Sequence, residues 1–238
     1  MSFDNQGLNL LAFDTSTETL TAAVQKGGML VAEESAAGGA HASASLIPVL
    51  QSLLARAQLT VAALDCIVFG RGPGSFTGLR TACAVAQGFG FGASVAVLGI
   101  DTLLAVAEDA RQRSGENRIV AVLDARMNEV YAARFAHSGG QWQQEGEIVL
   151  TRPGVLEVPA GWAIAGNAFA AYGAQLPSHA RRIDAAPHAT AMLRIAPQFI
   201  AAGQAQDAAR AMPVYIRDKV AQTTDERAAA RAGLPPTP

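Results

Sequence analysis

The sequence is short of lysine, cysteine and charge. Lys26 and Lys219 are its only lysines among 238 residues, 16% of the residues are charged, and the net charge is −2. Without a basic field the chain does not attract nucleic acid, so any RNA contact is expected to be local or made by a partner. Cys66 and Cys83 are too few for a disulfide framework or a zinc-thiolate site. Both cysteines lie in segments that are predicted to be buried. We therefore expect them to be free core thiols in a reducing compartment.

No segment is predicted to leave the cytoplasm. Residues 1–5 have neither the basic region nor the apolar stretch of a secretory signal. Residues 81–100 are uncharged and have about the length of a membrane span. Four glycines, Gln87 and Ser94 interrupt this stretch, so it predicts a helix followed by a buried strand. We expect a cytoplasmic protein without membrane contact.

A glycine-rich loop is the most distinctive motif that is present. The run Gly70-Arg71-Gly72-Pro73-Gly74-Ser75-Phe76-Thr77-Gly78-Leu79-Arg80 follows an apolar strand and opens a helix over 81–91. Glycine lets a ligand or another backbone come close, and Ser75 or Thr77 can cap the helix. The loop lacks a P-loop lysine and the spacing of the dinucleotide fingerprint. An anion site at a helix N-terminus and a close-packing corner therefore both remain open.

A weak internal repeat predicts two α/β units. Residues 10–13 and 119–123 are apolar strands that end at Asp14 and Asp124, and each is followed by two further strands around a Gly-Gly turn. Helices are expected over 40–57, 102–111 and 189–203. We predict an α/β fold of two tandem actin-like (ribonuclease H-like) lobes, each a mixed sheet flanked by helices. The expected ranges are 1–105 for the first lobe, 106–220 for the second lobe with a C-terminal helix, and 221–238 for a disordered tail.

Four segments resemble the TsaB (YeaZ) family: residues 11–17, 70–80, 123–131 and 213–217. The resemblance runs from about Leu10 to Val220. It implies a non-catalytic subunit that activates the related TsaD subunit in forming N6-threonylcarbamoyladenosine on tRNAs that read codons starting with A. It also implies a TsaE-like P-loop ATPase as a further partner, tRNA contact only through the complex, and a homodimer when the chain is alone. No cofactor is expected on this chain alone, and ATP or ADP is expected at the seam with TsaD.

Metal chemistry is not expected here. The TsaD relatives hold their metal with a His-x-x-x-His pair, and the matching positions of this sequence are Thr102 and Val106. Neither side chain binds zinc or iron at useful affinity. The four histidines form no i, i+4 pair that could share a helix face. We therefore expect no enzyme, with a metal-dependent glycoprotease-like peptidase as one alternative.

The second alternative is an actin-like small-molecule kinase. Such ATPases place glycines after each cleft aspartate, whereas Asp124 is followed by Ala125, Arg126 and Met127. Arg126 is bulky where phosphate would pass. It is expected to bind an anion or, preferably, to pair with Asp14 or Asp124 across the cleft.

Two helices are the candidate partner surface. The helix over 40–57 is amphipathic, and the helix after the glycine loop is small and apolar nearly all round. A helix that is apolar on every face must be covered on every face. We hypothesise a four-helix interface with TsaD or a second copy, with ordinary core packing as the alternative. The predicted contact residues are Leu46, Leu50, Leu53, Gly78, Ala82, Ala86 and Gly90, and the candidate anion or seam contacts are Arg71, Gly72, Gly74, Ser75 and Arg80.

Overall fold

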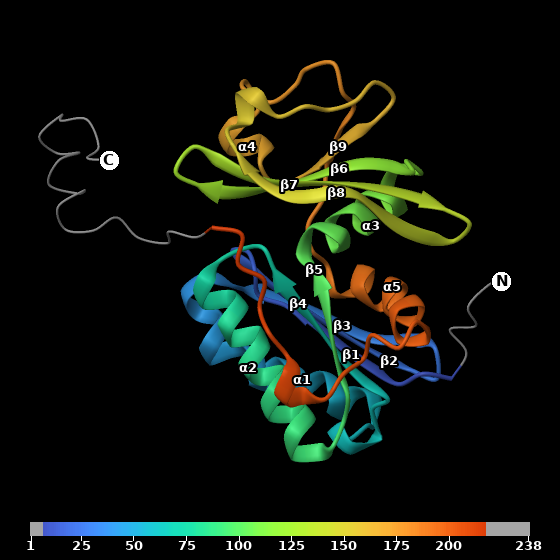
Figure 1. Ribbon diagram of the computed structural model, residues 1–238. Helices are drawn as coiled ribbons and strands as arrows, with labels where there is room; N and C mark the ends of the chain where they lie inside the picture. Colours follow the sequence, from blue (N-terminus) through green and yellow to red (C-terminus); the bar gives the residue numbers. More distant parts are fainter. Residues whose placement is uncertain (1–6, 218–238) are drawn as a thin grey trace, which may run out of the picture.

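Two lobes are each built on a five-stranded mixed sheet (Figure 1). The computed structural model describes residues 7–217. The strand order is β3-β2-β1-β4-β5 in the first sheet and β10-β9-β6-β7-β8 in the second. The strands are β1 (Leu10–Asp14), β2 (Thr19–Lys26), β3 (Met29–Ala37), β4 (Cys66–Gly72), β5 (Val97–Asp101), β6 (Arg118–Arg126), β7 (Glu129–Ser138), β8 (Gln141–Thr151), β9 (Ala163–Gly166) and β10 (Arg182–Asp184). The predicted fold class is confirmed.

The internal repeat is visible as two antiparallel meanders. β1, β2 and β3 pair in sequence, as do β6, β7 and β8. The second turn of each meander is a Gly-Gly pair with positive φ at both residues, Gly27-Gly28 and Gly139-Gly140. Such turns match the twist of antiparallel strands. The first strands of the two meanders, β1 and β6, end near one another at the junction of the lobes.

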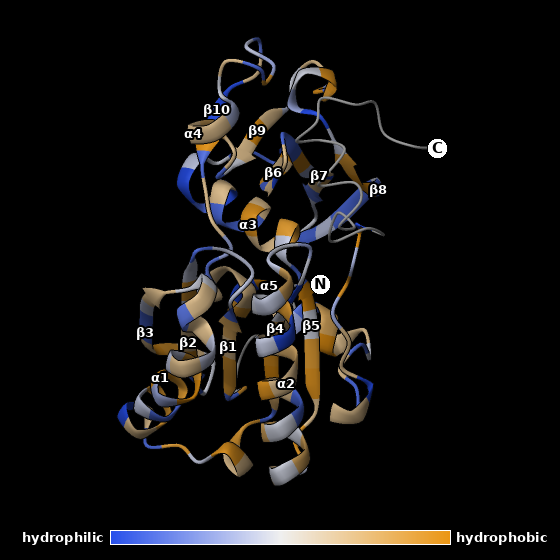
Figure 2. Ribbon diagram, turned by 90° about the vertical axis from the view of Figure 1, so that its left-hand side faces the viewer, coloured by the Kyte–Doolittle hydropathy of each residue, from blue (hydrophilic) through white to orange (hydrophobic). Residues whose placement is uncertain are grey.

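Helices cover both faces of the first sheet. The α-helices of the described residues are α1 (Ala42–Ala57), α2 (Phe76–Ala93), α3 (Thr102–Ser114), α4 (Phe169–Tyr172) and α5 (Ala189–Ala201), and α4 belongs to the second lobe. α1 and α2 lie on one face, while α3 and α5 lie between the two sheets (Figure 1). Figure 2 shows the apolar strands β1, β4 and β5 enclosed in the first lobe. A single apolar cluster continues from the first sheet through α3 and α5 to the second sheet.

The C-terminal helix packs on the first lobe. α5 contacts β1, β2, β4 and β5, and the Thr21 hydroxyl donates to the Pro187 carbonyl oxygen at 3.0 Å. This corrects the predicted assignment of the C-terminal helix within 106–220. The apolar side chains of α5, such as Met192 and Ile195, cover the sheet face that α1 and α2 leave bare. The expected tail, 221–238, lies outside the described residues.

The uncharged stretch 81–100 divides into the end of α2 and the strand β5, as predicted. Among residues 7–217, no helix is long and apolar enough to cross a membrane.

Candidate functional site between the lobes

The glycine-rich loop packs against the turn that follows Asp14. Thr15 Oγ1 donates to the Gly78 carbonyl oxygen at 2.7 Å, and the Ser75 N–H donates to the Ser16 carbonyl oxygen at 2.7 Å. A Cβ at Gly70 would overlap Asp14 Oδ2, and one at Gly78 would overlap the Thr15 carbonyl oxygen. On the side of the Asp14 turn, the chain's own atoms therefore fill the space that a phosphate would need. The loop is a close-packing corner.

Asp14 is fully buried beneath this corner. Its Oδ1 accepts hydrogen bonds from the Ser16 N–H at 2.8 Å and the Ser16 hydroxyl at 2.6 Å. Burial raises the pKa of Asp14 to about 6, because desolvation outweighs the bonds from Ser16 and Thr102. The carboxyl is held by its own turn and by Thr102.

The two positions that match the TsaD metal ligands are filled by packing groups. Thr102 and Val106 on α3 are both fully buried, and Thr102 Oγ1 lies 3.4 Å from Asp14 Oδ2. Across residues 7–217, no group of three or more His, Cys, Asp or Glu side chains could hold a metal ion.

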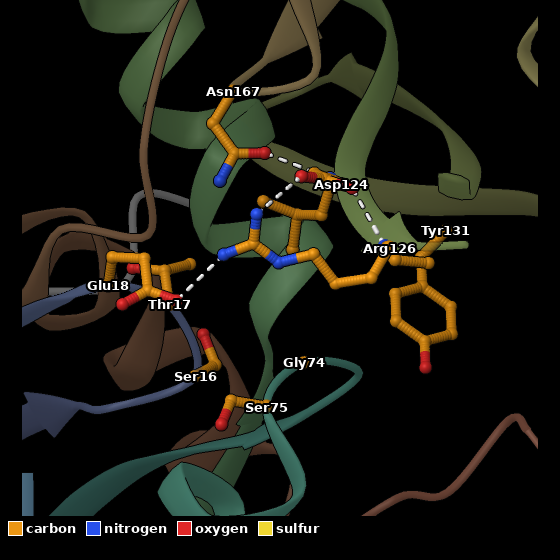
Figure 3. Close-up of a pocket in the computed structure, with 11 residues that line it drawn as sticks. Ser16, Thr17, Glu18, Gly74, Ser75, Asp124, Arg126, Tyr131 and Asn167 are labelled. Carbon is orange, nitrogen blue, oxygen red and sulfur yellow. Dashed lines mark hydrogen bonds and ion pairs between the residues drawn. The ribbon is translucent and has the colours of Figure 1, made fainter. Parts of the chain in front are cut away.

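The second cleft turn is closed by an ion-pair network (Figure 3). Arg126 Nη1 donates to Asp124 Oδ2 at 3.2 Å, and Arg126 Nη2 donates to Glu18 Oε1 of the first lobe at 2.8 Å. The predicted pairing with Asp124 is confirmed, and Glu18 takes the place that was expected for Asp14. Tyr172 donates its hydroxyl to Asp124 at 2.9 Å. The cleft between the two turns has a volume of about 290 Å³.

The candidate anion contacts have different surroundings. Arg71 Nε donates to Asp101 Oδ1 at 2.6 Å, so its charge is neutralised within the chain. Ser75 caps α2 by accepting from the Gly78 N–H at 3.5 Å. Gly72 and Gly74 are close-packed. Arg80 stacks on the Phe76 ring, 3.7 Å from the ring centroid, and has no acidic partner among the described residues.

The predicted partner-contact residues face inward. Leu46, Leu50, Leu53, Ala82 and Ala86 are fully buried, and Gly78 and Gly90 are buried in α2. Except for the two glycines, they belong to the apolar cluster beneath the first sheet. This is a correction: helical spacing locates an apolar face but not what covers it. The face of α2 that a partner can reach carries Ala84, Gly88, Phe91 and Gly92, which are exposed.

The signal for this outer face was present but missed. Gly88 and Gly92 stand four residues apart within a helix, and a Cβ at either position would meet nothing within 4 Å. Glycine inside a helix costs about 1 kcal/mol relative to alanine. Neither glycine is needed for packing within residues 7–217.

These features define a class: a two-lobed, actin-like protein whose metal-ligand positions and phosphate-facing turns are occupied by its own side chains and backbone. The family model for TsaD, tRNA N6-adenosine threonylcarbamoyltransferase, matches residues 18–232. The tRNA threonylcarbamoyladenosine biosynthesis protein TsaB of Escherichia coli (strain K12) is 31% identical, over 90% of this chain and 96% of that protein. TsaB of Haemophilus influenzae is 32% identical at the same coverage.

A solved structure, YeaZ from Pseudomonas aeruginosa, superimposes with a TM-score of 0.82 at 34% identity, over 87% of this chain and 99% of that chain. A second structure, of an uncharacterised protein with similarity to the peptidase YeaZ from the same organism, also gives a TM-score of 0.82 at 34% identity, over 88% of this chain and 100% of that chain. The chain belongs to the TsaB (YeaZ) family.

Proposed function

We propose that this chain is a non-catalytic partner in tRNA threonylcarbamoyladenosine biosynthesis, where it binds and activates a TsaD-type subunit. The observation that carries the proposal is the filled site. Thr102 and Val106 are buried packing residues where the related subunit places its metal ligands. A neutral hydroxyl and an isopropyl group supply no useful transition-metal site. We infer that the chain instead binds and positions the TsaD-type subunit, which has the metal site.

The outer face of α2 supports the partnership. Ala84, Gly88 and Gly92 recur every fourth residue along one face, and small residues let a second helix approach closely. Phe91 lies beside them and is 81% exposed. An exposed aromatic next to a row of small residues suits a helix of the TsaD-type subunit, or a second copy of this chain when that subunit is absent.

The finer parts of the assembly belong to the same proposal. Arg80, whose guanidinium has no acidic partner in the described part of the chain, is the candidate contact for ATP or ADP at the seam. A TsaE-like ATPase and the tRNA would be met through the complex, in the cytoplasm.

Binding of a TsaD-type protein tests the proposal. Ala84→Glu places a charge on the outer face of α2, whereas Ala171→Glu places the same charge on an exposed position of α4. Calorimetry should show the Ala84→Glu affinity reduced at least about tenfold, with the circular dichroism spectrum unchanged, because a buried unpaired charge weakens an interface. Equal affinities for the two variants would contradict the proposed surface.

A further inference from the structure

A second cavity adjoins the cleft on the side of the C-terminal strap, which we define as residues 205–217. It has a volume of about 290 Å³ and shares Gly74, Ser75, Ala125, Arg126 and Tyr131 with the cleft. The strap runs along α2 toward the second lobe (Figure 1). It is tied to the first lobe by the Val214 N–H, which donates to the Arg71 carbonyl oxygen at 2.7 Å.

Tyr131 brings an unused donor to this cavity. The residue is only 8% exposed, and within residues 7–217 its hydroxyl has no hydrogen-bond partner. Figure 3 shows the ring extending from β7 with the hydroxyl directed away from Asp124. Burial raises the pKa of Tyr131, so the phenol keeps its proton at neutral pH and can donate it. The hydroxyl oxygen is not among the fully buried unpartnered atoms, so it is open to the cavity and can donate to an acceptor placed there.

The charges that line the cavity are positive. Arg126 and Arg217 are among its lining residues, and no carboxylate is. Arg126 is paired with Asp124 and Glu18, and Arg217 is paired with Glu129 at 2.6 Å, so neither guanidinium is a free charge. The Arg217 Nε has no partner but is fully buried. The arginines therefore line the cavity, while the Tyr131 hydroxyl is its open donor. The N-terminus of α2 also borders the cavity through Ser75 and Phe76. The first N–H groups of a helix attract negative charge.

The remaining walls are apolar. Pro73, Leu79, Val214 and Ile216 face the same space. A volume of about 290 Å³ equals that of about ten liquid water molecules at ~30 Å³ each. The cavity therefore suits a ligand of about ten heavy atoms, with an anionic oxygen at one end and an aliphatic group at the other.

We propose that this cavity is a binding site for a small aliphatic carboxylate. The carboxylate accepts a hydrogen bond from the Tyr131 hydroxyl and faces the α2 N-terminus and the two arginines, while the aliphatic group lies against Leu79, Val214 and Ile216. The site goes beyond the proposed partnership and does not depend on it, because every group that forms it belongs to this chain.

Amide chemical shifts of the full chain test the site, with N-acetyl-valine as the probe and N-acetyl-valinamide as its uncharged match. The acid should bind with a dissociation constant of about 1 mM and shift the amides of Phe76, Tyr131 and Arg217. The amide should bind at least about tenfold more weakly, since a hydrogen bond to a charged group is worth more than one to a neutral group.

Two variants locate the effect. Tyr131→Phe removes the hydroxyl but keeps the packed ring. It should weaken binding of N-acetyl-valine about tenfold. Ser114→Ala removes a hydroxyl that donates to the Ala110 carbonyl oxygen on α3, outside the cavity, and should leave binding unchanged. Matching melting temperatures would exclude misfolding.

Three results would overturn the proposal. Equal binding of the acid and the amide would mean that the cavity binds only the apolar part of the probe. Equal binding of inorganic phosphate at the same amides would mean an adventitious ion only. Unchanged binding in Tyr131→Phe would place the probe elsewhere.

Discussion

At the scale of single residues, Asp14 is a carboxyl group whose burial disfavours its charged form. It is fully buried, and its hydrogen bonds come from its own turn and from Thr102 rather than from a cation. Its pKa is raised because desolvation of the charge outweighs the hydrogen bonds that favour it. In a relative that uses this turn for phosphate or metal, the charge would have a function, whereas here it is a cost that the packed corner tolerates.

The stability of the chain should therefore depend on pH through Asp14. Its pKa rises from an ordinary value of 3.8 to about 6 on folding. Its contribution is then fully present below pH 3.8 and is lost as the pH rises through 6. The substitution Asp14→Asn keeps an acceptor for Ser16 and removes the charge. Urea unfolding should favour Asp14→Asn over wild type by about 2 kcal/mol more at pH 7 than at pH 4. A pH-independent difference would contradict this pKa.

Some residue contacts were predictable from sequence and others were not. Arg126 stands two residues after Asp124, so their pairing followed from the turn. Glu18 lies more than a hundred residues away in the sequence, and only the arrangement of the lobes brings its carboxylate to Arg126. The unpaired hydroxyl of Tyr131 was equally hidden, because the strand pattern of β7 says nothing about what its inward side chains meet.

At the scale of elements, α2 has two faces with different tasks. Its inner face fits under the first lobe with Gly78 against the Thr15 backbone, and its outer face carries Gly88 in open space. Helical periodicity was enough to predict α1 and α2, but their inner faces were mistaken for the partner surface. The choice between faces depends on where the sheet lies, which periodicity does not contain.

Substitution by alanine should change the free energy of unfolding in opposite directions at Gly78 and Gly88. Gly78→Ala drives a methyl group into the Thr15 carbonyl oxygen and should lower the free energy of unfolding by about 3 kcal/mol. Gly88→Ala meets nothing and should raise it by about 1 kcal/mol, since alanine is the better helix former. Thermal unfolding of both single variants checks the pair. Stabilisation by Gly78→Ala would show that the corner is not tightly packed.

At the scale of the whole molecule, the lobes are joined by a shared core, an exposed ion pair and the strap. Glu18 and Arg126 have side chains that are 76% and 67% exposed, so their cross-lobe pair is screened by water. Arg217 at the end of the strap is 15% exposed and bonds to Glu129 and to the Ala125 carbonyl oxygen of the second lobe. The contact of Arg217 with the second lobe should therefore contribute more to the free energy of unfolding than the exposed Glu18–Arg126 pair.

Urea unfolding should separate these two connections. Glu18→Gln should change the free energy of unfolding by less than about 0.5 kcal/mol. Arg217→Ala should lower it by about 2 kcal/mol, because it leaves Glu129 without its cation and removes a half-buried network. The reverse order of the two effects would mean that the strap does not hold the lobes together.

The most direct measurement is threonylcarbamoyladenosine formed on tRNA in a reconstituted mixture, with each protein omitted in turn. The mixture contains this chain, a TsaD-type subunit, a TsaE-like ATPase, the enzyme that makes threonylcarbamoyl-adenylate, and ATP, bicarbonate and threonine. The account predicts modified tRNA in the complete mixture, a loss of product without this chain, and no product from this chain in the absence of the TsaD-type subunit. Modified tRNA formed without the TsaD-type subunit would contradict the non-catalytic role.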